Sequence, residues 1–242
     1  MTAKPQLVIQ DFGGAHNADL NKTRARLSKG GSWKRQRIVV VIPSYDLIPA
    51  KVVLSWLNLA FPPNNGVARI IALGQEVGEA YSTAIEQILA HPELGTWEYL
   101  LTIEHDNAPP PDGVIKLLER MEAHPEMSWI SGLYHTKGEG GVAQIWGSVD
   151  GSDPVLNFRP QLPDPNGGFV ECAGTGMGFA IWRLSMFKDS RLRKPWFVTQ
   201  KKDGVATQDL FFAQDARKYG YRCGVSCDVK VGHYDHVADI MW

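Results

Sequence analysis

Apolar and polar residues follow two different periods along the chain, and these periods predict strands and helices. Residues 38–42 form a continuous β-branched run that Pro43 ends, which is typical of a buried parallel strand. Residues 68–73 and 99–103 predict two further strands, and residues 78–90 place their apolar side chains on one helical face. A second helix is expected after the third strand, because apolar residues recur at helical spacing in Val114, Leu117, Leu118 and Met121.

The second half of the chain has shorter apolar segments. It predicts a helix over residues 209–219 and a long irregular loop over residues 150–168, where proline and glycine are frequent. Short strands are expected over residues 128–133, 143–148, 179–183 and 225–231. The alternation of strands and helices predicts an α/β fold with a mostly parallel sheet flanked by helices. Ligands of such sheets bind beyond the carboxyl ends of the strands, so the polar residues that follow each strand are the candidate ligand-binding residues.

Composition limits the function without naming it. The chain has 242 residues, of which 44% are apolar, so it can bury a sizeable core as one large α/β domain or two small ones. Lys and Arg total 25 against 26 Asp and Glu, and a net charge of -1 excludes a global attraction to nucleic acid or anionic membranes.

Three further features predict a cytoplasmic location. The start of the chain lacks the apolar region of a signal peptide, and no apolar run approaches the ~20 residues that span a bilayer. The three cysteines, an odd number without a framework spacing, favour reduced and buried thiols. They are Cys172, Cys223 and Cys227.

Several polar residues stand where chemistry is expected. Glu104 and Asp106 leave the third strand, and carboxylates there can hold a divalent cation. His233 follows the last strand and could complete such a site, because a neutral imidazole is a common metal ligand. Asp209 opens a helix and could act as a general base. Structural explanations remain open for each: a solvated acidic turn, a buried histidine, and a helix start that Thr207 caps and the helix dipole favours.

A glycine-rich segment over residues 173–178 precedes the predicted strand at 179–183. Glycine allows positive φ angles and a close approach of the backbone to a ligand. Gly174, Thr175 and Gly176 therefore either border a bound ligand or form a tight turn.

The order and spacing of these segments resemble the GT-A fold glycosyltransferases, especially the inverting family 2 group. The resemblance runs from about Arg37 to His236. The segments that carry it are IVVVIPSYD, WEYLLTIEHDNAPPPDGVIKLLERM, ECAGTGMGFAIWRLSMF and TQDLFFAQDARKYGYRCGVSCDVKVGHYDH.

The resemblance implies a metal-dependent enzyme that transfers a sugar, with inversion, from a nucleotide-diphosphate sugar to a hydroxyl acceptor. A UDP-sugar is the favoured donor. Asp106 would bind Mn²⁺ or Mg²⁺, with His233 as a further ligand and Glu104 near the ribose or the metal. Asp209 would be the base that deprotonates the acceptor. The nucleotide and donor sugar would lie near Pro43, Ser44, Tyr45, Asp46, Gly174, Thr175 and Gly176.

The chain departs from the family pattern in ways that concern the donor. Glu104 replaces the usual first aspartate, and Gln208 replaces the acid that normally precedes the base. Tyr81 and Ser82 stand where many relatives carry Arg-Asn. Two other classes stay open: a sugar-nucleotide nucleotidyltransferase, which would need a glycine-rich basic loop where this chain has PSYDLIPAK, and a non-catalytic nucleotide-sugar or carbohydrate-binding module.

The domain organisation predicted is a polar, basic arm over residues 1–36 and one GT-A catalytic domain over residues 37–242. Basic residues over 22–37 could join a second basic cluster to bind a phosphate-bearing acceptor, such as a modified DNA base, a lipid-linked phosphate or an anionic glycan. Scattered solvated charges are the alternative. The second cluster is Arg191, Arg193, Lys194, Lys201 and Lys202.

Overall fold

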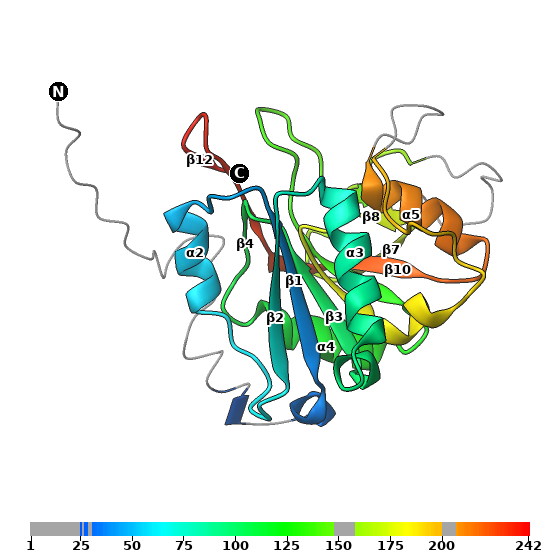
Figure 1. Ribbon diagram of the computed structural model, residues 1–242. Helices are drawn as coiled ribbons and strands as arrows, with labels where there is room; N and C mark the ends of the chain where they lie inside the picture. The colour runs from blue at the N-terminus through cyan, green and yellow to red at the C-terminus, as the bar shows by residue number, and fades with distance from the viewer. Residues whose placement is uncertain (1–24, 26, 29–30, 148–157, 200–206) are drawn as a thin grey trace.

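The computed structural model describes residues 25, 27–28, 31–147, 158–199 and 207–242. Within these residues the main sheet has seven strands in the order β2-β1-β3-β9-β5-β10-β7 (Figure 1). β2, β1, β3, β5 and β10 run in one direction, while β9 and β7 run in the other. The strands are β1 (Ile38–Ser44), β2 (Val67–Leu73), β3 (Tyr99–Ile103), β5 (Trp129–Leu133), β7 (Phe169–Cys172), β9 (Phe179–Arg183) and β10 (Cys223–Lys230).

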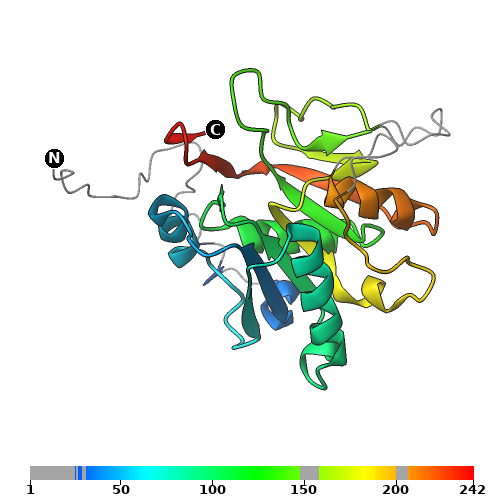
Figure 2. The same ribbon diagram turned by 45° about the horizontal axis from the view of Figure 1, so that its top comes forward.

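Helices cover both faces of this sheet, and strand alternation decides which side chains meet them. Val39 and Val41 of β1 pack with α3 on one face, whereas Ile38, Val40 and Ile42 pack with α4 on the other. α5 joins the α3 face, and α2 packs on the α4 face (Figures 1 and 2). The helices are α2 (Ala50–Leu57), α3 (Val77–Ala90), α4 (Gly113–Ala123) and α5 (Gln208–Arg217).

β9 occupies the middle of the sheet although it comes late in the chain. It pairs antiparallel with β3 on one side and with β5 on the other. β5 in turn pairs with β10, so the two halves of the sheet meet through β9.

Two small sheets and three short 3₁₀ helices complete the described structure. One small sheet has the order β12-β11-β4 and the other joins β6 to β8. Their strands are β4 (Asn107–Ala108), β6 (Ile145–Trp146), β8 (Gly174–Thr175), β11 (Gly232–Asp235) and β12 (Ile240–Met241). The 3₁₀ helices are η1 (Ser32–Arg35), η2 (Leu94–Thr96) and η3 (Leu184–Lys188).

The longer predicted elements agree with the structure, while the short strands β4, β8, β11 and β12 and the 3₁₀ helices were not expected. Three further differences concern α2, β6 and β7. α2 was not expected, and it begins after Pro49 in a stretch without a clear start signal. The strand expected over residues 143–148 is only the two-residue β6 within the described residues. Of the loop expected over residues 150–168, residues 150–157 lie outside the described residues, and residues 158–168 form no helix or named strand. β7, which follows, was not expected because its pairing with β10 is a long-range contact.

Three further observations concern the N-terminal segment, the cysteines and the character of the helices. In the segment expected as an arm, Trp33 of η1 is buried in the core on the α4 face. All three cysteines are free and buried. None of the helices in the described part of the chain has the length and apolar character needed to cross a bilayer.

Candidate active site

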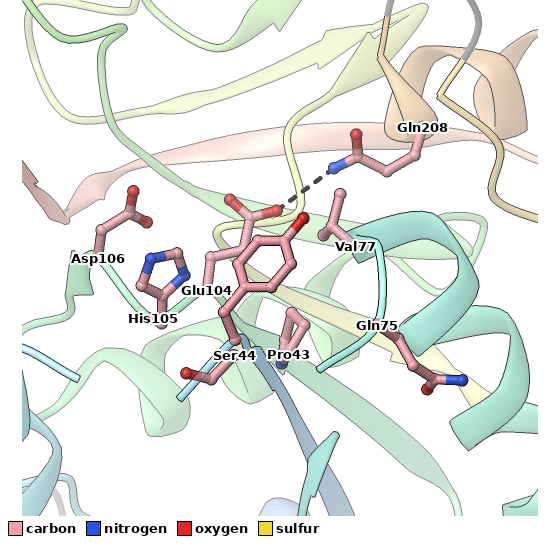
Figure 3. Close-up of a pocket in the computed structure, with 9 residues that line it drawn as sticks. Pro43, Ser44, Gln75, Val77, Glu104, His105, Asp106 and Gln208 are labelled. Atoms are coloured by element: carbon pink, nitrogen blue, oxygen red, sulfur yellow. Dashed lines mark hydrogen bonds between the residues drawn. The ribbon is translucent and has the colours of Figure 1, made fainter. Parts of the chain in front are cut away.

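A cavity of about 270 Å³ lies beyond the carboxyl ends of β1 and β3. Residues before and within the first turn of α3 and the first residue of α5 close its sides (Figure 3). Its position is the one expected for a ligand site of a parallel sheet. The lining residues are Pro43, Ser44, Tyr45, Gln75, Val77, Glu104, His105, Asp106 and Gln208.

A tight turn after β3 presents the acidic residues to this cavity. The Glu104 N–H donates to the carbonyl of Gly178 over 3.0 Å, and the Asn107 N–H donates back to the carbonyl of Glu104 over 3.0 Å. Asn107 then starts β4, which pairs with β11 so that His233 lies opposite Asn107. Strand pairing therefore brings a residue from the end of the chain next to Asp106.

Asp106 makes two contacts through one carboxylate oxygen. Lys137 Nζ donates to Asp106 Oδ2 over 2.6 Å, and His233 Nε2 lies 3.5 Å from the same oxygen. Burial by itself would raise the pKa of Asp106, but the contacts with His233 and Lys137 outweigh it and hold the pKa well below its usual range. Asp106 is thus a carboxylate at any ordinary pH.

The hydrogen bond on the far side of His233 fixes the tautomer of its neutral ring. His233 Nδ1 lies 2.7 Å from the carbonyl oxygen of His135, which can only accept a hydrogen bond, so Nδ1 carries the hydrogen. In the neutral ring, Nε2 then presents a lone pair toward the Asp106 carboxylate. With a hydrogen on Nε2 the ring donates to Asp106 and lowers the pKa of that acid; without it, the lone pair beside the carboxylate, with a carbonyl behind the imidazole, forms an arrangement typical of a metal ligand pair.

The predicted metal ligands come together only in part. Asp106 and His233 are neighbours, but across the described residues no three His, Cys, Asp or Glu side chains are grouped so as to hold a metal ion. Glu104 instead accepts a hydrogen bond of 3.4 Å from Gln208 Nε2 (Figure 3). The donor set is therefore one carboxylate and one imidazole, which suits a cation that completes its shell with water and ligand oxygens.

Glu104 has the opposite electrostatic setting to Asp106. Its removal from water, together with the nearby charges of Asp106 and Asp209, raises the pKa of Glu104 to about 8. At neutral pH this side chain is mostly a neutral acid, and it can donate a hydrogen bond as well as accept one.

Asp209 is held at the start of α5, next to the cavity-lining Gln208. It is buried, and its Oδ1 accepts from the Leu210 N–H over 2.8 Å. Burial raises the pKa of Asp209, while hydrogen bonds from Thr207 and from the backbone partly oppose that shift. Asp209 is not among the residues that line the cavity, but its charge reaches Glu104.

The glycine segment lies behind the cavity lining. Gly174 and Thr175 form β8, and a Cβ on Gly174 would come within 2.7 Å of Leu210 in α5. A Cβ on Gly176 would lie 2.0 Å from the hydroxyl oxygen of Tyr134. Both glycines thus have packing reasons to lack a side chain. Of the residues predicted after β1, Tyr45 lines the cavity, whereas Asp46 does not.

Lys137, Gln75 and Val77 were not singled out from the sequence as site residues, and Tyr81 was noted only as a departure from the family pattern. Lys137 lies beyond the carboxyl end of β5, and this position could have identified it as a candidate ligand-binding residue. The Tyr81 hydroxyl is buried without a hydrogen-bond partner among the described residues, and burial and the nearby Glu104 charge raise its pKa well above the usual value. Gln75 and Val77 line the cavity because α3 begins there.

Three of the six basic residues of these clusters that the structure describes pair with an acidic neighbour. Arg37 binds Glu98 over 2.6 Å, Arg191 binds Asp189, and Lys194 lies 3.7 Å from Glu86. The guanidinium of Arg193 stacks over the ring of Phe211. Lys22, Arg24, Arg26, Lys29, Lys201 and Lys202 lie outside the described residues.

Comparisons with known proteins bear on the fold. No family model matches the sequence, and a search of curated proteins finds no match. The crystal structure of A197 from STIV is similar, with a TM-score of 0.59 and 15% identity over 83% of this chain and 86% of that protein. Two structures of TarS residues 1–349 from S. aureus have lower TM-scores. That in complex with UDP-GlcNAc has 0.49 at 12% identity, covering 81% of this chain and 58% of that one. That of TarS 1–349 without a named ligand has 0.47 at 13% identity, covering 81% and 60%.

The similarity to A197 extends over most of both chains and concerns the fold alone. Together with the strand order and directions, it confirms the expected fold class: an α/β, GT-A-like, mostly parallel sheet flanked by helices.

Proposed function

We propose that this protein is a metal-dependent glycosyltransferase that moves a sugar, with inversion, from a nucleotide-diphosphate sugar to a hydroxyl acceptor. A UDP-sugar is the donor we favour. The observation that carries the proposal is the Asp106–His233 pair, whose oxygen and free ring nitrogen face each other at 3.5 Å beside a cavity at the carboxyl ends of β1 and β3.

Asp106 and His233 are the residues that would hold Mn²⁺ or Mg²⁺. A carboxylate with so low a pKa stays ionised, and an imidazole fixed by the His135 carbonyl keeps its lone pair available. A divalent cation bound there would neutralise the charge that develops on a departing diphosphate.

The rest of the cavity suits a nucleotide. Tyr45 offers an exposed aromatic ring, and the buried Ser44 hydroxyl has no hydrogen-bond partner within the described residues. A neutral Glu104 can donate to a base or ribose oxygen. We assign Pro43, Ser44, Tyr45, Asp46 and Glu104 to the nucleotide side.

Gly174, Thr175 and Gly176 belong to the side where the donor sugar and acceptor meet. Asp209, the second residue of α5, lies on that side and serves as the base. Burial raises its pKa toward the working pH, which favours proton uptake from an acceptor hydroxyl. Attack of that hydroxyl on the face of the anomeric carbon opposite the diphosphate gives inversion in a single displacement.

The substitution Asp209→Asn tests the assignment of the base. The amide keeps the shape of the side chain but cannot take a proton, so turnover should fall by ~10²–10⁴-fold. Nucleotide binding should stay within about twofold of wild type, because the assigned base does not touch the nucleotide. Release of nucleoside diphosphate from a panel of nucleotide-sugars and hydroxyl acceptors measures the first quantity, and calorimetry measures the second.

Asp106→Asn is the paired variant in the same experiment. It should abolish Mn²⁺-dependent binding of the nucleotide while leaving Asp209 intact. Turnover that survives Asp209→Asn would refute the base, and no diphosphate release from any donor with wild type would favour a non-catalytic binding module.

The proposal also includes the charge of the acceptor and the cellular compartment. Three of the six described basic residues in the two clusters pair with acidic neighbours, and we favour an uncharged hydroxyl acceptor over a phosphate-bearing one. Three buried free thiols agree with a reducing, cytoplasmic location.

A further inference from the structure

Lys137 reaches the site on a short hairpin that follows β5, here called the 134–144 hairpin. The Thr136 N–H donates to the Val142 carbonyl and the Gln144 N–H to the Tyr134 carbonyl, each over 2.9 Å. Glycines form the turn after Lys137, with φ of +99° at Gly138 and +74° at Gly140. The hairpin is the green loop that rises above the sheet in Figure 1.

Among the residues that the structure describes, none that lines the cavity is Lys or Arg. If the cavity holds a diphosphate, positive charge must reach it from beyond this described lining. Acidic side chains already occupy part of the first turns of the two helices that begin there, because Glu76 accepts from the Gly78 and Glu79 N–H groups in α3 and Asp209 accepts from the Leu210 N–H in α5. Within the described part of the chain, Lys137 is the basic side chain that contacts a lining carboxylate, over 2.6 Å to Asp106.

The same contact places Lys137 in conflict with a metal ion. Its ammonium group bonds to Asp106 Oδ2, the oxygen that also faces His233 Nε2. A divalent cation bound to that oxygen would meet a like charge at hydrogen-bond distance, so the cation and the ammonium group compete for Oδ2. Metal binding through Oδ2 therefore favours the departure of Lys137 from Asp106.

We propose that Lys137 exchanges partners during the catalytic cycle. In the empty enzyme it neutralises Asp106; when a divalent cation takes that carboxylate, Lys137 moves to an oxygen of the donor diphosphate. This inference rests on the proposed function and adds a second, protein-derived cation for the departing group.

The surroundings of Lys137 favour a phosphate as its second partner. Its side chain is 30% exposed, so it can turn on its hairpin without unpacking the core. The nearby Asp235 carboxylate accepts from the Val237 and Ala238 N–H groups over 2.9 and 3.2 Å, so it is already engaged. A diphosphate carries more charge and more free oxygens than that carboxylate.

Lys137→Met tests the exchange, because methionine keeps the length of the side chain and removes its charge. Lys51→Met is the matched control: it removes the same charge from an ion pair with Asp239 that does not involve Asp106. Electron paramagnetic resonance measures the affinity for Mn²⁺ alone. Calorimetry at saturating Mn²⁺ measures the affinities for UDP and for inorganic pyrophosphate, and circular dichroism checks that both variants fold.

The proposal requires two effects of opposite sign. Lys137→Met should bind Mn²⁺ about fivefold tighter, because the competitor for Asp106 is gone, yet bind UDP and pyrophosphate about fivefold more weakly. Lys51→Met should match wild type in all three. Unchanged Mn²⁺ affinity would overturn the competition, and unchanged UDP and pyrophosphate affinity would overturn the exchange. A failure of the proposed function would give a third, different result, because the wild-type protein would then bind no nucleoside diphosphate. In that case the Mn²⁺ affinities of wild type and Lys137→Met would still show whether Lys137 competes with the cation for Asp106.

Discussion

Glu104 and Asp106 are two residues apart but have opposite affinities for a proton. Burial and neighbouring carboxylates raise the pKa of Glu104 to about 8, whereas Lys137 and His233 hold that of Asp106 low. Pairs of acids pushed apart in this way commonly divide roles within one site. Here the ionised member would hold the cation, and the neutral member would donate to the nucleotide.

The raised pKa of Glu104 makes stability depend on pH. The unfolded carboxyl loses its proton near 4.5 and the folded one near 8, so between these values the folded protein binds an extra proton. Stability therefore falls as pH rises from 4.5 to 8. We expect a loss of at least about 1 kcal/mol, the equivalent of one pKa unit. Glu104→Gln should remove this part of the pH dependence, as measured by denaturant unfolding in EDTA.

Glu139→Gln is the control for that measurement, because Glu139 is an exposed carboxylate on the 134–144 hairpin. It should leave the pH dependence of wild type unchanged. Parallel stability curves for wild type and Glu104→Gln would contradict the assigned pKa.

The sequence predicted individual site residues better than their contacts. Glu104 and Asp106 follow a buried strand, and that placement identified both. The meeting of Asp106 with His233 depends on the pairing of β4 with β11, two short strands that no local pattern reveals. Lys137 could not be assigned a partner from the sequence, because it follows β5 whereas its partner Asp106 follows β3.

At the scale of elements, the glycine segment, residues 173–178, includes β8 and packs against Tyr134, the residue that follows β5. Tyr134 Oη accepts from the Gly178 N–H over 2.9 Å, and the α-carbon of Gly176 faces the same hydroxyl. The segment and the tyrosine therefore fit together only if residue 176 has no side chain.

Gly176→Ala should displace Tyr134 and cost about 1–3 kcal/mol of stability, as overpacking does. The cost should be smaller in a Tyr134→Phe background, which removes the oxygen 2.0 Å from the new Cβ. A double-mutant cycle by thermal unfolding measures this coupling. Additive effects of the two substitutions would mean that the glycine is needed for some other reason.

Most elements were predictable because their apolar pattern is local. The buried run of β1 and the one-sided helices α3 and α4 have strong periodic signals. β7 has no such signal, since its structure comes from pairing with β10 across 50 residues of chain, Cys172 to Cys223 being one register pair. α2 is short and lies on an apolar patch, so tertiary packing rather than a start signal defines it.

At the scale of the molecule, an aromatic cluster ties α5 to the sheet. Trp129 and Trp182 stack at 5.0 Å between β5 and β9, and Phe212 of α5 meets both rings at 5.7 Å. The position of Asp209, one turn earlier in α5, depends on this packing.

Phe212→Ala should destabilise the protein by about 3–5 kcal/mol, because it leaves a cavity under α5. Met121→Ala, in the core on the opposite face, is the comparison variant. At a temperature where both stay folded, Phe212→Ala should reduce nucleoside diphosphate release more strongly, since it alone loosens the helix that carries Asp209. Equal rates in the two variants would argue against that coupling.

The place of β9 has a consequence for the order in which the protein can assemble during synthesis. β2, β1 and β3 can pair as soon as they leave the ribosome, but both sheet neighbours of β5 are made later. In a nascent chain that stops before Phe179, β3 therefore has one unpaired edge, and β5 has no strand partner on either edge. Translation must pass Arg183 before the halves join, and it must reach His233 before the cation pair can exist.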